Sequence, residues 1–401
     1  MTDSRIPGIA WGLAALALVL PSFEAPKNLL LAGLALYAVT IGRHALARSV
    51  KGADAIEWAL FAMLGATALS IIWNWKLLSP GSAFKDVATQ ALVCWVAYRL
   101  LPTGRGMRRV GAAICLGTVL GLVYGAWEAL QGKHPLFEFH VVGAAPRSAI
   151  YLGIATFVGI GLLVFPTEKG WSPKRMLLMF AVIGMFVAIW LMGSRGGVLA
   201  LIIALAIVAS TLGGLRRLFV AVAALLASCL VAFTLPNAFV QDRLLQKVRT
   251  MFVEYSLPGS DSERVSVWKA TIAKIHSGQD LIFGVGPERF RQVFDHTALS
   301  NFGHAHNLFL NKLLEEGVLG MCALLAFFVV IALRLYKGAA RGEITWLWIA
   351  AVGALVIPIV GGSFNSPFMK AHALLSMMVL GMWAASAGSK DVRVPLHSSG
   401  T

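Results

Sequence analysis

Charged residues are scarce in this chain. Of its 401 residues, 13% are charged and 58% are hydrophobic, and the mean hydropathy is +0.76. A soluble domain carries about twice that share of charged residues. This scarcity excludes an ordinary soluble domain. Repeated apolar runs of about 20 residues, the length that crosses a bilayer, predict a polytopic membrane protein instead.

Cysteine is also rare. All four cysteines fall inside apolar runs, without the spacing of a metal site or a disulfide framework, and we expect them to be small core residues. The formal net charge is +15, which in a soluble protein would indicate nucleic acid. In a membrane protein, Lys and Arg in cytoplasmic loops account for much of this charge, so no nucleic-acid partner is expected.

We predict an all-α fold with about twelve transmembrane helices and one large outer loop that contains short helices. The predicted spans are 6–21, 28–44, 56–75, 86–101, 110–131, 148–165, 176–192, 198–213, 218–235, 315–335, 345–361 and 372–388. We expect the first span to stay uncleaved, because no convincing small-residue cleavage site follows it. The chain then divides into helices 1–9 at 1–235, a loop domain with catalytic elements at 236–314, and helices 10–12 with a tail at 315–401.

Basic residues collect in alternate loops, which sets the orientation. The loops with few basic residues contain only Lys27, Lys76, Lys85, Lys133, Arg147, Arg195 and Lys370. The positive-inside rule places the Lys- and Arg-rich loops, and with them both termini, in the cytoplasm. The segment 236–314 then lies on the outer face, which is the periplasm in a Gram-negative cell.

The outer segment is predicted to have local structure of its own. Ser260-Asp261-Ser262-Glu263 has the form of a capping box, which predicts a helix from there to about His276. Arg264 and Trp268 would lie on one face of this helix, since they are four residues apart. Residues 283–290 predict a turn followed by a short helix.

The first candidate site is Gly193-Ser194-Arg195-Gly196-Gly197, which joins two apolar runs almost without a loop. We expect Arg195 at the outer membrane boundary, between two helices, where a charge is costly and seldom without function. The glycines allow a tight turn and a close approach of a ligand to the backbone. The alternative is an arginine that reaches out to lipid phosphates.

Two further arginines are candidates for binding a phosphate or pyrophosphate. Arg264 stands near the start of the predicted capped helix, where its donors add to the positive end of the helix dipole. Arg147 lies just before the span that begins near Ile150 and is another cation at the outer boundary. The alternatives are a solvated Arg264 paired with Glu263, and an Arg147 that reaches to lipid.

His304-Ala305-His306-Asn307 precedes the tenth predicted span. Two histidines at this spacing can form half of a metal site, and Asp295-His296 is nearby. No third or fourth ligand has the spacing of a known site, so no metal is expected. Next to a helix start, His306 is well placed as a proton acceptor near the membrane surface. A surface histidine without a role is the alternative, more so for His304 than for His306.

The pattern His-Asn-x-x-Leu-x-x-Leu-x-Glu-x-Gly-x-x-Gly at 306–320 resembles the signature of the O-antigen ligase and O-antigen polymerase family. The pieces that carry the resemblance lie between Met192 and Gly320 and follow the family's order: Ser-Arg-Gly at 194–196, Arg264 with Trp268, Gly-x-Gly at 284–286 with Phe290, and His306-Asn307 with Glu316 and Gly317.

The resemblance implies a GT-C-like membrane enzyme that transfers a glycan from undecaprenyl pyrophosphate, without a metal ion or other cofactor and with inversion at the sugar. It implies two arginines on the pyrophosphate, matching Arg195 and Arg264, with Arg147 as a further candidate. It also implies a histidine that activates the acceptor, matching His306. Secondary candidates around them are His304, Arg289, Asn307 and Trp268.

Three acceptors compete within this family. A ligase uses lipid A–core, an O-antigen polymerase uses another carrier-linked repeat unit, and a protein O-oligosaccharyltransferase uses a serine or threonine. The compact chain with one substantial outer loop resembles a ligase more than the other two, and this resemblance implies a role in lipopolysaccharide biosynthesis at the inner membrane. A lipid or glycan transporter is the alternative from another class, but the middles of the predicted spans contain almost none of the ionisable residues that proton-coupled transport needs.

Overall fold

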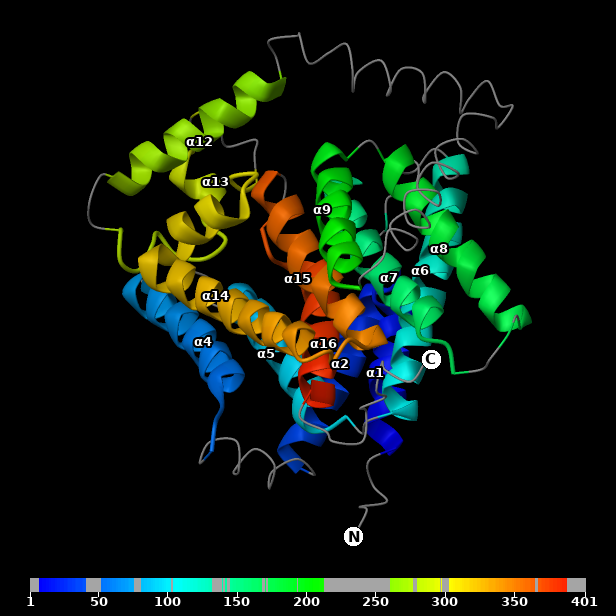
Figure 1. Ribbon diagram of the computed structural model, residues 1–401. Helices are drawn as coiled ribbons and strands as arrows, with labels where there is room; N and C mark the ends of the chain where they lie inside the picture. Colours follow the sequence, from blue (N-terminus) through cyan, green and yellow to red (C-terminus); the bar gives the residue numbers. More distant parts are fainter. Residues whose placement is uncertain are drawn as a thin grey trace.

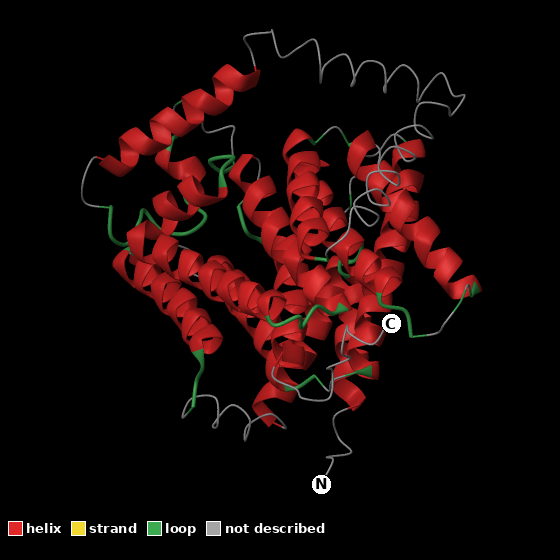
Figure 2. Ribbon diagram, in the orientation of Figure 1, coloured by secondary structure: helices red, strands yellow, loops and turns green. Residues whose placement is uncertain are grey.

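The computed structural model describes residues 7–40, 52–75, 81–101, 104–131, 139, 141–142, 145–167, 170, 172–192, 194–212, 260–276, 280–295, 297, 303–364 and 367–387. All regular secondary structure in these ranges is helical (Figure 2). The helices are α1 (Pro7–Val19), α2 (Glu24–Thr40), α4 (Ala55–Trp73), α5 (Gly81–Arg99), α6 (Arg105–Leu130), α7 (Ala145–Val164), α8 (Pro173–Leu191), α9 (Arg195–Thr211), α12 (Ser260–His276), α13 (Phe290–Val293), α14 (Leu308–Ala340), α15 (Trp346–Phe364) and α16 (Lys370–Ala387).

The predicted helices are present wherever the structure describes them. Each predicted span coincides with a helix, except 218–235, which lies outside the described residues. The predicted helix from Ser260 to His276 and the short helix after residue 289 are also confirmed. Six helices, α4, α6, α7, α8, α14 and α15, are long and apolar enough to cross a membrane. The chain is therefore a multi-pass membrane protein, and the secondary structure of its described residues is helical.

Two hydrophobic cores organise the described residues. The large core lies inside the helix bundle, where α15 packs against α7, α9 and α16. Glycines bring α7 and α15 close, since a Cβ on Gly161 would lie 2.3 Å from the carbonyl oxygen of Trp346. A small second core joins α12, α13 and the first turns of α14 through residues such as Val267, Phe290 and Leu314. Figure 1 shows α12 and α13 together on one side of the bundle, at the opposite end from the chain's N-terminus.

Helix α14 differs from the predicted tenth span, which was expected to begin at residue 315. It begins at Leu308 instead, because the Asn307 side chain caps it by accepting hydrogen bonds from the N–H groups of Phe309 and Leu310 at 2.9 and 3.0 Å. Leu310, Leu313 and Leu314 in its first turns belong to the small second core. The helix is broken at Gly317, whose φ is 67°.

The break in α14 would leave backbone groups without partners, and the segment 281–286 supplies them. Val285 and Gly286 donate their N–H groups to the carbonyl oxygens of Leu314 and Glu315, at 2.9 and 3.0 Å. In return, the N–H of Val318 reaches the carbonyl oxygen of Leu281 at 2.8 Å. A broken helix at membrane depth is tolerated only where neighbouring protein satisfies its backbone in this way.

Polar side chains of α4 complete this junction. Ser70 donates its hydroxyl to the carbonyl oxygen of Glu315 at 3.0 Å, and Thr67 donates to the carboxylate of Glu316 at 2.8 Å. The Asn74 side chain donates to the carbonyl oxygen of Gly284 at 3.1 Å. The C-terminal end of α4 is thus held together with the segment 281–286 and the kink in α14 as one unit.

We expect Gly317→Ala to destabilise the protein. Alanine is strained at a φ of 67°, and its Cβ would lie 2.2 Å from the carbonyl oxygen of Ile282. Such strain costs about 1–3 kcal/mol before the clash is added. Gly65→Ala in α4 is the matched control, because its Cβ would meet nothing within 4 Å. Thermal unfolding of the purified protein in detergent measures both, and equal melting temperatures for the two variants would contradict this account of the kink.

Candidate active site

The C-terminal turn of α15 is the point at which three other helices begin. Gly361 lies against Ile150 in the second turn of α7, and a Cβ placed on it would be 3.8 Å from the carbonyl oxygen of Gly196 in α9. Gly362 packs against Leu308, the first residue of α14. The carbonyl oxygen of Ser363 accepts a hydrogen bond from the Asn307 side chain at 2.9 Å. The N-terminal ends of α7, α9 and α14 therefore meet around residues 361–363, which we call the α15 hub.

Helix N-termini attract anions, because their first N–H groups lack intrahelical partners and the helix dipole is positive there. At the α15 hub, Ser194 caps α9 by accepting the N–H of Gly197 at 3.3 Å, and Gly197 packs against Ala149 of α7. Arg195 is the first residue of α9; its side chain lies outside the described part of the structure. Arg147 is in the first turn of α7 and is half-buried. The predicted sites at 147 and 195 thus lie on adjacent helix starts.

His304 and His306 are packed against each other beside this hub. The backbone N–H of His306 donates to Nδ1 of His304 at 3.1 Å, and the ring centroids are 4.3 Å apart. Because Nδ1 of His304 accepts, the proton of its neutral ring is on Nε2. Burial is the main cause that lowers the pKa of His304 from 6.5 to about 3, and the charges of His306, Arg147 and Lys370 add to it. His304 is therefore a neutral acceptor that holds the backbone of His306.

The backbone is strained at this site. Among the described residues, three that are not glycine have a positive φ: Glu288 (59°), His306 (50°) and Lys370 (57°). Such conformations cost about 1–3 kcal/mol and tend to cluster at functional sites. Lys370 acts electrostatically on His304, and Glu288 is next to the segment that binds the kink of α14.

Helix α12 packs directly on the histidine segment. The indole N–H of Trp268 donates to the carbonyl oxygen of Ala305 at 3.0 Å, and Val267 is fully buried in the small core. Arg264 lies one helical turn before Trp268 and is half-buried. This hydrogen bond therefore holds the first turns of α12, which contain Arg264, near the histidine segment.

The remaining predicted candidates make contacts with the protein backbone. Arg289 donates from Nη1 to the carbonyl oxygen of Val285 at 3.0 Å. Asn307 caps α14 and binds the α15 hub, as described above. Through these contacts, Arg289, Asn307 and Trp268 hold backbone segments around the site in place. Sequence reasoning missed the hub and Lys370, although Gly-Gly-Ser at the end of an apolar span is a visible signal of close helix contact.

The described residues contain no group of three or more His, Cys, Asp and Glu side chains that could hold a metal ion. His296, the nearby residue considered as a ligand, lies outside the described part of the chain. Cations at helix starts are thus the groups that the described site offers to an anionic ligand.

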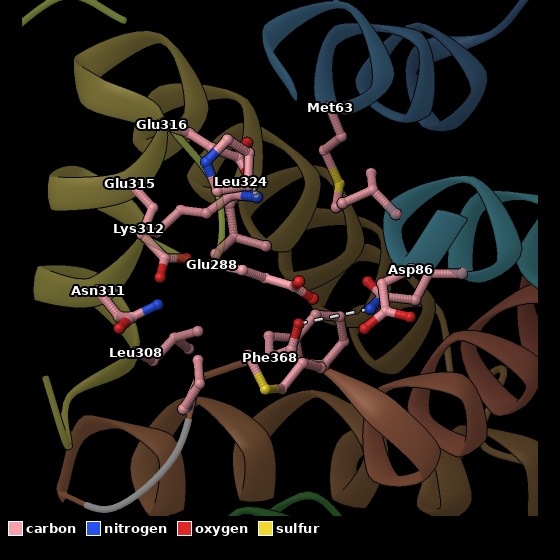
Figure 3. Close-up of a pocket in the computed structure, with 15 residues that line it drawn as sticks. Met63, Asp86, Glu288, Leu308, Asn311, Lys312, Glu315, Glu316, Leu324 and Phe368 are labelled. Carbon is pink, nitrogen blue, oxygen red and sulfur yellow. Dashed lines mark hydrogen bonds and ion pairs between the residues drawn. The ribbon is translucent and has the colours of Figure 1, made fainter. Parts of the chain in front are cut away.

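A cavity lies next to the histidine segment. Leu308 and Asn311 line it from α14, and Asn311 accepts the N–H of Ala305 at 3.0 Å through its side-chain oxygen. Figure 3 shows Asp86 entering the cavity from α5 and extending toward Glu288 on the opposite side. A second cavity shares Asp86 and Gln90 with the first.

Residues 180–325 match the family model described as O-Antigen ligase. The match begins within α8 and extends through α9, α12 and α13 into α14, so it includes the histidine segment and the kink at Gly317. The resemblance on which the sequence analysis relied is therefore confirmed. No curated protein matches the chain.

We expect the neutral state of His304 to make stability depend on pH. The pKa of His304 is lowered in the folded protein, so between about pH 6.5 and 3 the unfolded chain binds a proton that the folded protein does not. The stability of the wild type should fall as pH decreases below about 6.5, by up to about 1.4 kcal/mol per pH unit.

The His304→Asn variant isolates this effect. Asparagine keeps an oxygen that can accept the N–H of His306 but does not titrate. Melting temperatures measured between pH 7 and pH 5 should decrease more steeply for the wild type than for His304→Asn. Parallel curves would show that His304 does not titrate differently in the folded and unfolded states.

Proposed function

We propose that this member of the O-antigen ligase family transfers O-polysaccharide from undecaprenyl pyrophosphate to lipid A–core in lipopolysaccharide biosynthesis. In this proposal the chain crosses the inner membrane of a Gram-negative cell twelve times, with both termini in the cytoplasm and the site in the periplasm. The observation that carries the proposal is the meeting of three helix N-termini, two of them with arginines and one preceded by His306, at the α15 hub.

The pyrophosphate of the donor would bind at the hub. Arg147 and Arg195 stand on neighbouring helix starts, and α12 brings Arg264 toward the same place. Arginine binds phosphate oxygens through a planar fork of donors, and helix N-termini add further N–H groups. Pyrophosphate is a good leaving group, and these cations would absorb its developing charge in place of a divalent metal ion.

The acceptor hydroxyl would be activated by His306. The hydroxyl oxygen attacks the anomeric carbon of the donor sugar, and the bond from this carbon to the pyrophosphate oxygen breaks, with inversion at the carbon. The hydroxyl proton passes to the His306 ring, and undecaprenyl pyrophosphate leaves with the electron pair of the broken bond. A well-placed histidine base contributes about 10²–10⁴-fold to such a step.

Transfer by the purified protein in detergent tests the proposal. The reaction contains undecaprenyl pyrophosphate-linked glycan, lipid A–core and EDTA. We expect the wild type to make the ligated product and His306→Ala to lose at least about 10²-fold in rate. Product that depends on a divalent metal ion, and so stops in EDTA, would contradict the role given to the arginines.

The choice of acceptor separates this proposal from its alternatives. A wild-type protein that extends the carrier-linked glycan but ignores lipid A–core is a polymerase. A protein that modifies only serine or threonine of a polypeptide is an O-oligosaccharyltransferase. A folded wild-type protein that transfers glycan to none of these acceptors would overturn the enzymatic function and favour transport.

We also expect Arg147→Gln to reduce kcat/KM for the donor by about 10–100-fold, because an arginine that stabilises the leaving group acts mainly in the transition state. Arg341→Gln is the matched control, since Arg341 is exposed beyond the far end of α14 and pairs with Glu343. Steady-state kinetics at saturating acceptor measure both variants. Equal kcat/KM values for Arg147→Gln and Arg341→Gln would show that Arg147 does not act on the donor.

A further inference from the structure

Two adjoining cavities near the α15 hub share two lining residues but differ in the charged residues that line them. The acidic chamber has as its charged lining Asp86, Glu288, Lys312, Glu315 and Glu316. The lysine chamber has as its charged lining Glu24, Lys27, Lys85, Asp86 and Lys370. Asp86 and Gln90 line both chambers, so these two residues of α5 stand at the boundary between them.

The acidic chamber is unsuited to the pyrophosphate. Its only cation among the described lining residues is Lys312, which already pairs with Glu316. Asp86, Glu288 and Glu315 add three further carboxyl groups to its lining, so this chamber offers few groups that would attract an anion. Carboxylate oxygens accept hydrogen bonds well, and the Asn311 amide is also available to the chamber. These acceptors suit a ligand that is rich in hydroxyl groups.

The acidic chamber also has an apolar side. Phe368 lines it, and its carbonyl oxygen accepts a hydrogen bond from the Gln90 side chain at 3.4 Å (Figure 3). Leu308, Leu324 and Met63 are further apolar residues of its lining. A sugar ring presents hydroxyl groups at its rim and C–H groups on its faces, so a chamber with carboxylates on one side and Phe368 on another matches both.

The lysine chamber adds a place for negative charge. Lys27 is 7% exposed and pairs with Glu24 at 2.7 Å, which leaves Lys85 and Lys370 against the single carboxylate of Asp86. Lys85 lies near the start of α5 and Lys370 at the start of α16, where the helix dipoles are also positive. This chamber therefore fits a phosphate or carboxylate group.

Both chambers adjoin the residues assigned to the reaction. Leu308 follows His306 by two residues and lines the acidic chamber, while Lys370 lines the lysine chamber and acts electrostatically on His304. The donor arginines stand on α7, α9 and α12, whereas the charged linings of the chambers come from α2, α5, α14, α16 and residue 288. The two groups of helices would thus present different ligands to His306.

We propose, building on the function proposed above, that the two chambers together bind the acceptor, a sugar that carries an anionic group. Its hydroxyls bind the carboxylates of the acidic chamber, and its phosphate or carboxylate binds Lys85 and Lys370 in the lysine chamber. Asp86 and Gln90 contact the sugar at the boundary and are determinants of acceptor specificity.

Steady-state transfer kinetics with the full-length protein test this assignment. The variants are Asp86→Asn in the acidic chamber and Lys85→Gln in the lysine chamber, and Glu343→Gln, in the loop after α14, is the matched control. We expect each chamber variant to raise the KM for lipid A–core by about tenfold, because a lost charged hydrogen bond weakens binding by about that factor. The donor KM and kcat should change by less than about twofold, and the control should resemble the wild type. A donor KM that rises while the acceptor KM stays constant would assign the chambers to the donor and overturn the proposal.

A binding measurement without donor keeps this test independent of catalysis. Native mass spectrometry of the protein with phosphorylated and enzymatically dephosphorylated lipid A–core compares their affinities. The wild type should prefer the phosphorylated form by about tenfold, and Lys85→Gln should lose this preference. Binding of the phosphorylated form that is equal in wild type and Lys85→Gln would overturn the proposal even if transfer is observed. If the wild type prefers the phosphorylated form but transfers no glycan, that result contradicts the proposed function and not the assignment of the chambers.

Discussion

Backbone N–H and C=O groups cannot remain unpaired inside a bilayer, and the arrangement of this site follows from how that constraint is met. Helix α14 is broken at Gly317, and the segment 281–286 pairs with the backbone groups that the break releases. The break allows the first turns of α14 to join the small core of α12 and α13, while the rest of the helix packs in the bundle. The histidine segment before α14 is therefore attached to a rigid unit.

The second constraint is close approach between helices. The glycines of the α15 hub leave room for the starts of α7, α9 and α14, so that three positive helix ends share one small region. His304 then holds the backbone of His306 in a left-handed conformation. In the proposed function, His306 is the base, and the starts of α7 and α9 supply the arginines. The small residues of the α15 hub are what allow these helix starts to meet.

Much of the fold could be predicted from the sequence, because the apolar runs and the capping box at residues 260–263 are local signals. The candidate residues Arg147, Arg195 and His306 come from the same local signal, since each stands next to the end of an apolar run, and their roles stay predictions. The start of α14 was predicted too late, because Leu310, Leu313 and Leu314 pack into the small core with α12 and α13 and not into the bundle. Gly317 gave no sign of a break, since its left-handed φ depends on the distant segment 281–286. The chambers were also missed, because Asp86, Glu288 and Lys370 are far apart in the chain and each resembles an ordinary loop charge.

The central claim is that the α15 hub binds the pyrophosphate of the donor. Cryo-electron microscopy of the protein in nanodiscs, with an undecaprenyl-linked glycan whose pyrophosphate is replaced by a methylenediphosphonate, tests it most directly. The account predicts density for the two phosphorus atoms at the starts of α7 and α9, in contact with Arg147 and Arg195 and next to His306. Diphosphonate density in the lysine chamber, or away from the hub altogether, would contradict it.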